Sequence, residues 1–145
     1  MFKHILSPTD GSETARKAIG AGLRFAKEAG AKVTCFYGIE DMNPHHAGVH
    51  PSPQVQAEID RRTRQIADMA VAEVVELAKK EGVQVETHVM PVAAPHEGIV
   101  STAADRGCDL ILMASHGRGA LSSLMTGSVT LKVLATSKVP VLVYR

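Results

Sequence analysis

Strand-like and helix-like segments alternate five times along this chain, and no other property of the sequence restricts its fold as strongly. The apolar, strand-like runs are Phe2–Ser7, Val33–Tyr37, Val83–Met90, Leu110–Met113 and Val139–Val143. Helix-like segments separate these runs, with neither an internal repeat nor a linker between them. Such an order is typical of a parallel sheet with helices on both faces and right-handed crossovers. We therefore predict one α/β domain, residues 1–145.

Capping residues and glycines mark the predicted helices. The first helix has Ser12 as its N-cap and stops at Gly30. Inside it, Gly20 and Gly22 each cost roughly 1 kcal/mol relative to alanine, which suggests close packing against a sheet. The other predicted helices are 54–81, 95–107 and 129–137.

The long helix from Gln54 to Glu81 has an apolar stripe opposite a charged face. The stripe consists of Val55, Ile59, Ile66, Met69, Ala70, Val74 and Leu77. The charged face includes the run Arg61–Arg64, which either attracts an anionic partner or is simply solvated. Before this helix, Gly38 to Pro53 is predicted as an irregular loop. The loop carries His45, His46 and His50, which are either a metal site or incidental side chains in solvent.

Three of the strand-like runs indicate their positions in the sheet. Val83 to Met90 alternates apolar and polar residues, so it is predicted at a sheet edge or covered on one side only. Leu110 to Met113 is apolar throughout, as expected of a central parallel strand. The last run, Val139–Val143, is either an exposed edge that pairs with another chain or a strand buried under the protein's own helices.

Composition limits the classes of protein to which the chain can belong. The sequence is 45% hydrophobic with a formal net charge of +1, which argues against disorder and against a nucleic-acid-binding surface. No apolar run approaches the ~20 residues that span a bilayer, and the N-terminus lacks the apolar region of a signal peptide. Cys35 and Cys108 are expected to be reduced and buried. We expect a soluble cytoplasmic protein that binds neither nucleic acid nor a membrane.

A glycine-rich segment, Ala114–Ser128, lies between the fourth strand-like run and the last helix. Its glycines, Gly117, Gly119 and Gly127, allow the backbone to approach an anion closely. The first N–H groups of the following helix, for which Ser128 is the expected N-cap, lack partners within the helix. This arrangement is typical of a phosphate site. The alternative is a surface loop that only joins strand to helix, since glycine-rich loops are common and only sometimes functional. Neither a Walker A nor a G-x-G-x-x-G motif is present.

The spacing in this segment resembles the G-x-x-G-x9-G-[ST] motif of nucleotide-binding universal stress proteins. Here Ala114-x-x-Gly117-x9-Gly127-Ser128 matches every position but the first. The likeness extends over the whole chain, through the runs ILSPTDGS, SHGRG, GSVTLKVL and VPVLV. At the departing position, Ala114 costs about 1–2 kcal/mol if a positive φ is required, and is tolerated if only space is required.

The resemblance implies a Rossmann-like, five-stranded parallel sheet of order 3-2-1-4-5 and a crevice that binds ATP or AMP with Mg²⁺. The residues implied at the crevice are Pro8, Thr9, Asp10, Gly38, Ala114, His116, Gly117, Arg118, Gly127, Ser128 and Val129. The glycine-rich segment and the helix start would line the phosphates, and Asp10 would lie near the ribose. The adenine would border Gly38, where relatives often carry a larger apolar residue.

Several roles implied by the resemblance have alternatives. Asp10 also suits a turn that starts the first helix, and His116 suits proton transfer or a hydrogen bond to a phosphate or the backbone. As a whole, the resemblance implies a nucleotide-responsive stress protein that forms a homodimer through Val139–Val143. A nucleotide-free interaction module of the same fold and a slow ATPase are the alternatives. No Ser-His-Asp order or paired-carboxylate signature indicates a catalytic site.

Overall fold

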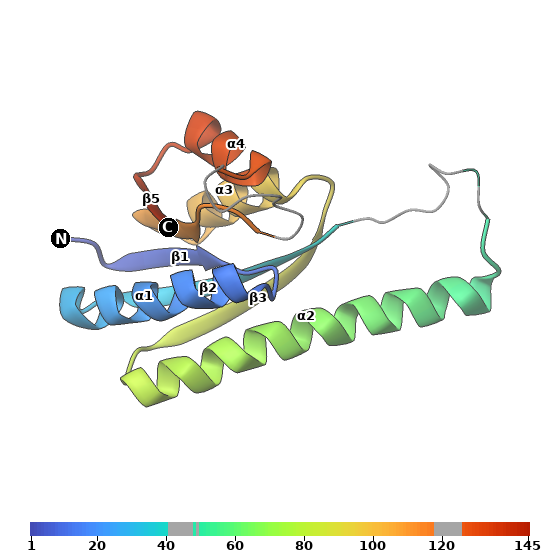
Figure 1. Ribbon diagram of the computed structural model, residues 1–145, viewed down its shortest axis with the longest axis horizontal. Coiled ribbons are helices and arrows are strands. Elements are labelled where there is room, and N and C mark those ends of the chain that lie inside the picture. Colours follow the sequence, from blue (N-terminus) through green and yellow to red (C-terminus); the bar gives the residue numbers. More distant parts are fainter. Residues whose placement is uncertain (41–47, 49, 118–125) are drawn as a thin grey trace.

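The computed structural model describes residues 1–40, 48, 50–117 and 126–145, and its centre is a parallel sheet (Figure 1). The strands in this part of the chain are β1 (His4–Pro8), β2 (Lys32–Glu40), β3 (Val85–Val92), β4 (Leu110–Ala114) and β5 (Val141–Tyr144). Their order across the sheet is β3-β2-β1-β4-β5, and every neighbouring pair is parallel. The predicted fold class and strand order are therefore confirmed. The alternating strand lies at one edge, as predicted, and the apolar strand β4 lies inside the sheet.

Helices cover both faces of the sheet. They are α1 (Glu13–Ala29), α2 (Pro53–Glu81), α3 (Pro95–Asp105) and α4 (Ser128–Thr136). Helices α1 and α2 pack on one face, and α3 and α4 pack on the other (Figure 1). Each pair encloses its own apolar cluster, one around Ile19 and Leu112 and the other around Leu6 and Phe36. Burial of these side chains, at roughly 25 cal/mol per Å² of apolar surface, stabilises the layered arrangement.

Two strand boundaries, the end of β2 and the start of β5, differ from the sequence prediction. β2 continues to Glu40, three residues beyond Tyr37, because its register with β3 extends to the pair Glu40 and Val92. The first part of the predicted loop, from Gly38 to Glu40, is therefore strand. β5 begins at Val141 rather than Val139, because the preceding backbone is held by Ser137 and interrupted by Pro140.

The helix ends follow the predicted chemistry with one correction. The Ser12 hydroxyl accepts a hydrogen bond from the Ala15 N–H at 3.2 Å, and Gly30 ends α1 with φ +64°. At α4, however, the N-cap is Gly127, and Ser128 is the first residue of the helix. The backbone of Gly127 is extended, its N–H donates to the Ser115 carbonyl at 2.7 Å, and its carbonyl accepts from the Leu131 N–H at 3.0 Å. The expected capping role of Ser128 is wrong by one position.

The two glycines inside α1 differ in their surroundings. A Cβ at Gly22 would lie 3.1 Å from Leu112 Cδ2 and 3.4 Å from Ser7 Oγ, so α1 approaches β4 and β1 most closely here. A Cβ at Gly20 would meet only the Arg24 guanidinium, at 3.8 Å. Close packing is confirmed at Gly22 and wrong at Gly20, which lies away from the sheet.

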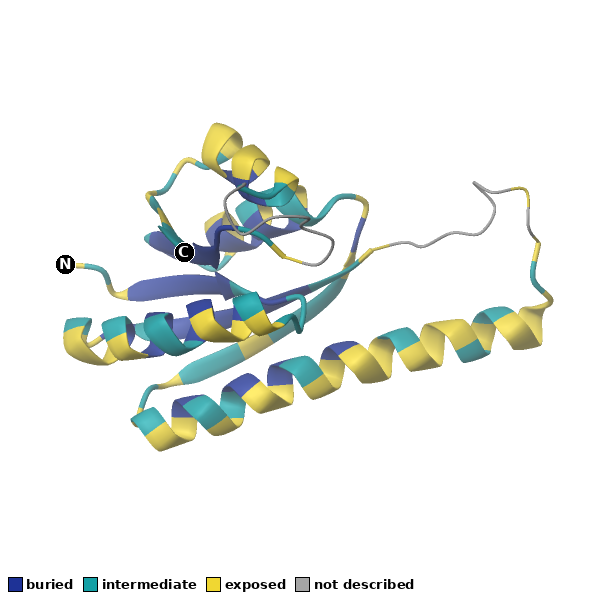
Figure 2. Ribbon diagram, in the orientation of Figure 1, coloured by how far each residue is buried: buried dark blue, intermediate teal, exposed yellow. Residues whose placement is uncertain are grey.

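The apolar stripe predicted on α2 is covered only in the second half of the helix, where Val74 is buried and Ala70 and Leu77 pack against the core. Val55, Ile59, Ile66 and Met69 are all exposed. The buried residues are Ala67, Val71, Val74 and Ala78, all in the second half of the helix. The first half extends beyond the sheet and is mostly exposed (Figure 2). Small residues form the buried face because they let α2 lie close to the sheet.

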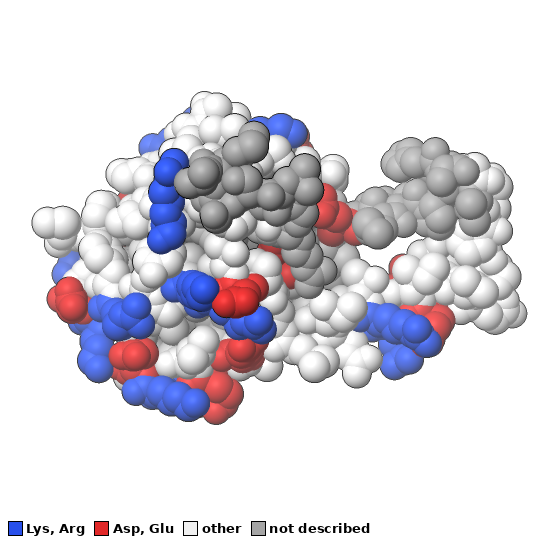
Figure 3. All heavy atoms as spheres, viewed as in Figure 1, with Lys and Arg blue, Asp and Glu red and all other residues white. Residues whose placement is uncertain are grey.

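Charged side chains are mixed rather than segregated. On the face shown in Figure 3, Lys and Arg side chains lie among Asp and Glu side chains. On α2, Arg61 and Arg62 both contact Glu58, and Arg64 contacts Asp68, which favours the solvated-face interpretation of this run. These hydrogen bonds from Arg61 and Arg62 lower the pKa of Glu58 to about 2. Cys35 and Cys108 are free thiols and buried, as expected. In the described part of the chain, no helix is both long enough and apolar enough to cross a bilayer.

Candidate functional site

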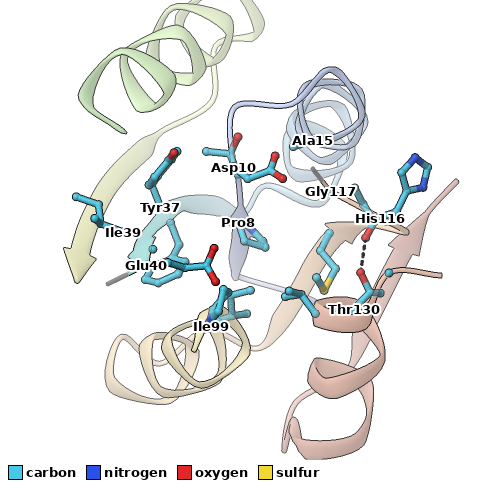
Figure 4. Close-up of a pocket in the computed structure, with 18 of the residues that line it drawn as sticks. Pro8, Asp10, Ala15, Tyr37, Ile39, Glu40, Ile99, His116, Gly117 and Thr130 are labelled. Atoms are coloured by element: carbon cyan, nitrogen blue, oxygen red, sulfur yellow. Dashed lines mark hydrogen bonds between the residues drawn. The ribbon is translucent and has the colours of Figure 1, made fainter. Parts of the chain in front are cut away.

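A cavity of about 620 Å³ opens at the carboxyl edge of the sheet (Figure 4). Its walls come from the β1–α1 turn, the ends of β2 and β4, the first turns of α3 and α4, and the middle of α2. The predicted site residues that line it are Pro8, Thr9, Asp10, Gly38, Ala114, His116, Gly117, Gly127, Ser128 and Val129. Arg118 lies outside the described residues. The structure thus brings the two predicted segments together at one cavity.

The strand order explains why these segments meet. β1 and β4 are neighbours, with Ile5 opposite Leu110 and Leu6 opposite Ile111. The segments that follow both strands therefore leave the same edge of the sheet side by side. Helix α1 then crosses one face and α4 the other, which leaves a crevice between their N-termini. Crevices at such switch points of parallel sheets are where ligands bind.

Asp10 and Gly117 form the contact between the two segments. Asp10 Oδ1 accepts a hydrogen bond from the Ser12 N–H at 2.9 Å, so the carboxylate holds the turn before α1. Its other oxygen, Oδ2, lies so close to Gly117 that a Cβ there would overlap it. The Thr9 N–H, which donates to the Phe36 carbonyl at 2.8 Å, fixes the same turn to β2. The turn-forming role suggested for Asp10 is confirmed, and the side chain also borders the cavity.

The N-terminus of α4 presents backbone donors to the cavity. No side chain of the described residues caps this end of the helix. The N–H groups of Ser128 and Val129 belong to the first turn, where a helix provides no internal acceptor. The Thr130 hydroxyl donates to the Ala114 carbonyl at 2.9 Å and fixes the helix to the end of β4 (Figure 4). The donors and the positive end of the helix dipole together favour an anion here.

Ala114 departs from the related motif, and Gly38 stands where similar proteins often carry a larger apolar residue. Ala114 belongs to β4, and no described residue other than glycine has a positive φ, so alanine introduces no strain. At Gly38, a Cβ would lie 3.0 Å from Val92 Cγ2 and 3.3 Å from Phe36 Cε1. Val92 therefore occupies the space that a side chain at position 38 would need. A side chain at position 38 would therefore require Val92 and Phe36 to shift, and this packing favours glycine.

His116 lines the cavity, but its imidazole ring is held on the outer side. The ring nitrogen Nδ1 is 3.0 Å from Ser115 Oγ, and Nε2 is 3.4 Å from Thr14 Oγ1. Figure 4 shows the ring pointing away from Pro8 at the centre of the cavity. In this position the side chain supports the loop, and proton transfer to a ligand would require the ring to turn inward.

Other lining residues were not identified from the sequence. They include Tyr37, Ile39, Glu40, Thr63, Ile66, Pro95, Ile99, Met113 and Thr130. Most are apolar, and Tyr37, Ile39 and Glu40 form the end of β2. Glu40 is the charged residue among them, and with Asp10 it is one of two carboxylates in the described lining. No lysine or arginine occurs among the described lining residues.

The histidines of the loop before α2 are only partly placed. His45 and His46 lie outside the described residues, whereas His50 lies inside them. Within the described part of the chain, no three His, Cys, Asp or Glu side chains gather closely enough to hold a metal ion.

Comparison with known proteins gives a consistent result over the full length. The model of the universal stress protein family matches residues 1–145. Universal stress protein MJ0577 of Methanocaldococcus jannaschii is 31% identical over 156 residues, covering 100% of this chain and 96% of the relative. A universal stress protein of Thermus aquaticus is 33% identical over 145 residues, covering 100% of both chains.

Solved structures show the same similarity in three dimensions. The structure of MJ0577 matches with a TM-score of 0.82 at 31% identity, covering 99% of this chain and 95% of that one. A universal stress protein in complex with cAMP matches with a TM-score of 0.70 at 21% identity, covering 99% and 97%. The universal stress protein of Archaeoglobus fulgidus in complex with dAMP matches with a TM-score of 0.71 at 17% identity, covering 100% and 98%. At the last two identities, the likeness shows the fold alone.

Proposed function

Because the chain belongs to the universal stress protein family, we propose that its cavity binds an adenine nucleotide, ATP or AMP. The protein would act as a homodimer in the cytoplasm, and its nucleotide-bound state would be the signal in a stress response. Two structurally similar members of the family are complexes with cAMP and dAMP, which supports an adenine nucleotide as the ligand.

The observation that carries the proposal is the contact between Asp10 and Gly117 beside the N-terminus of α4. It joins a carboxylate that suits ribose hydroxyl groups to a backbone that suits phosphate oxygens. The phosphates would lie against the N–H groups of Ser128 and Val129, with the Ser128 hydroxyl as a further donor. The base would lie at the opposite, more apolar end, beside Gly38.

The charge of the cavity explains why a metal ion accompanies ATP in this proposal. The described lining contains the carboxylates of Asp10 and Glu40 and no lysine or arginine. The negative charges of a triphosphate would therefore find no cationic side chain in the described lining, and Mg²⁺ would neutralise part of that charge. Arg118 would add a charge-assisted hydrogen bond to a phosphate oxygen. AMP carries less charge and depends less on a cation.

The homodimer in the proposal is supported by an exposed apolar edge. β5 lies at the end of the sheet, and Leu142 on it is 38% exposed. On the neighbouring helix α4, Leu131 and Leu134 are 55% and 47% exposed. An uncovered strand edge beside apolar side chains favours pairing with a second chain.

Titration of the purified protein with ATP and Mg²⁺, and with AMP, tests the proposal. At a ligand concentration a hundredfold above Kd, the free energy of unfolding rises by about 2.7 kcal/mol. For a chain of 145 residues, this is a rise in Tm of roughly 5–10 °C. Absence of both heat and a Tm shift up to millimolar nucleotide would favour the nucleotide-free interaction module. Phosphate release that disappears in a Ser128→Ala variant would favour the slow ATPase.

A further inference from the structure

Glu40 is a charged side chain at the apolar end of the cavity. It is the last residue of β2 and lies on the same face of the strand as Phe36 and Gly38. Figure 4 shows its carboxylate pointing into the cavity, toward Pro8 and Ile99. Tyr37 and Ile39, on the two sides of Gly38, add apolar surface to the same end. A flat base placed against this surface would meet the carboxylate at its edge.

The carboxylate is available to a ligand. Within the described part of the chain, the Glu40 side chain forms no hydrogen bond and no ion pair, and the residue is exposed to solvent. A bound base would remove water from the carboxylate. Because an ionised carboxylate only accepts hydrogen bonds, the base must then supply a donor. A base without a donor would leave a desolvated charge unpaired, which is costly.

The negative charge of Glu40 also determines which end of the ligand lies beside it. Phosphate groups are repelled by Glu40 and attracted by the N–H groups at the start of α4, on the other side of Pro8. The base therefore lies at the Glu40 end. We infer that Glu40 determines base specificity by accepting a hydrogen bond from an exocyclic amino group of the nucleotide base. This inference rests on the proposed nucleotide site, and it adds the chemical class of base that the site accepts.

Two purine bases carry the required chemistry, adenine through its 6-amino group and guanine through its 2-amino group. Each can be compared with an analogue that lacks only this group. AMP is matched by purine riboside 5′-monophosphate, and GMP is matched by IMP. Calorimetric titration of the wild-type protein with the four ligands then measures the contribution of each amino group to affinity.

A hydrogen bond to a charged group corresponds to about 10- to 150-fold in affinity. We expect AMP to bind more tightly than its analogue by a factor in this range. In a Glu40→Gln variant, the amide both donates and accepts, so the preference should fall to about threefold or less. Glu28→Gln, the same change at an exposed position near the end of α1, should leave the preference unchanged. Thermal unfolding without ligand should show equal Tm values for both variants and the wild type, since both positions are exposed.

The possible results separate this inference from the proposed function. Equal affinity within both ligand pairs, or a preference that persists in Glu40→Gln, would overturn the inference and leave nucleotide binding intact. A preference confined to GMP over IMP, lost in Glu40→Gln, would support the role of Glu40 and contradict adenine as the base. If none of the four ligands binds to the wild type, both the proposed function and the inference fail.

Discussion

Replacing Gly117 by alanine tests the contact that joins the two sides of the cavity. Gly117 does not have a positive φ, so alanine adds no backbone strain. The new methyl group would overlap Asp10 Oδ2 and force the carboxylate to turn. Turning would break the hydrogen bond that Asp10 Oδ1 accepts from the Ser12 N–H at 2.9 Å. Because the acceptor is charged and only partly buried, we expect the free energy of unfolding to fall by roughly 1–2 kcal/mol.

A double-mutant cycle with Asp10→Ala isolates this contact. In the Asp10→Ala background the hydrogen bond is already absent, so Gly117→Ala should change stability by no more than about 0.5 kcal/mol. Urea unfolding followed by circular dichroism is the suitable assay, since the chain has no tryptophan. The four curves should share one m-value. An equal cost of Gly117→Ala in both backgrounds would mean that the two residues do not touch, and would refute this reasoning.

Three further predictions concern packing, assembly and pH. In urea unfolding, Gly20→Ala should stabilise the protein by about 1 kcal/mol through helix propensity. Gly22→Ala places a methyl group 3.1 Å from Leu112 Cδ2, so it should be neutral or destabilising by up to about 2 kcal/mol. Leu142→Glu should convert the proposed dimer to a monomer in light scattering, and an unchanged mass would count against the β5 interface. Burial lowers the pKa of His4 below 6.5. As the pH falls through 6.5, the unfolded chain takes up a proton at His4 that the folded chain does not, so the free energy of unfolding should decline. A His4→Gln variant should show a weaker pH dependence between pH 7 and 5, and an identical slope would contradict the assignment.

The parallel α/β fold could be predicted from the alternation of strand-like and helix-like segments, whereas the order of strands and the position of the cavity were implied by the resemblance that the motif spacing carries. The glycines and hydroxyl residues of the motif act through local backbone geometry, which the sequence specifies directly. Gly117 and Gly127 accordingly lie where the resemblance implied, next to the turn that contains Asp10. The N-cap of α4 was predicted one residue too late, at Ser128 instead of Gly127, because serine and glycine both occur as N-caps.

The features that the sequence did not predict depend on distant parts of the chain. Gly38 suggested the end of β2, but Val92 packs against it and the strand continues to Glu40. The sequence prediction therefore placed Glu40 in a loop and did not identify it as a residue of the cavity. The buried face of α2 was predicted only in part. Val74 is buried as expected, but Ile66 stays exposed while Ala67 is buried. Periodicity gives the faces of a helix, but contact with the sheet decides which of them is covered.

Amide NMR spectroscopy during titration with AMP tests the central claim most directly, because it reports on the backbone N–H groups that would hold the phosphate. We predict the largest chemical-shift changes at Gly117 and at the first turn of α4, Ser128 to Thr130, with smaller changes at the end of β2. Changes clustered at the opposite edge of the sheet, around Lys32 and Arg106, would contradict a phosphate at the start of α4. A spectrum that does not change at millimolar AMP would contradict binding of this nucleotide altogether.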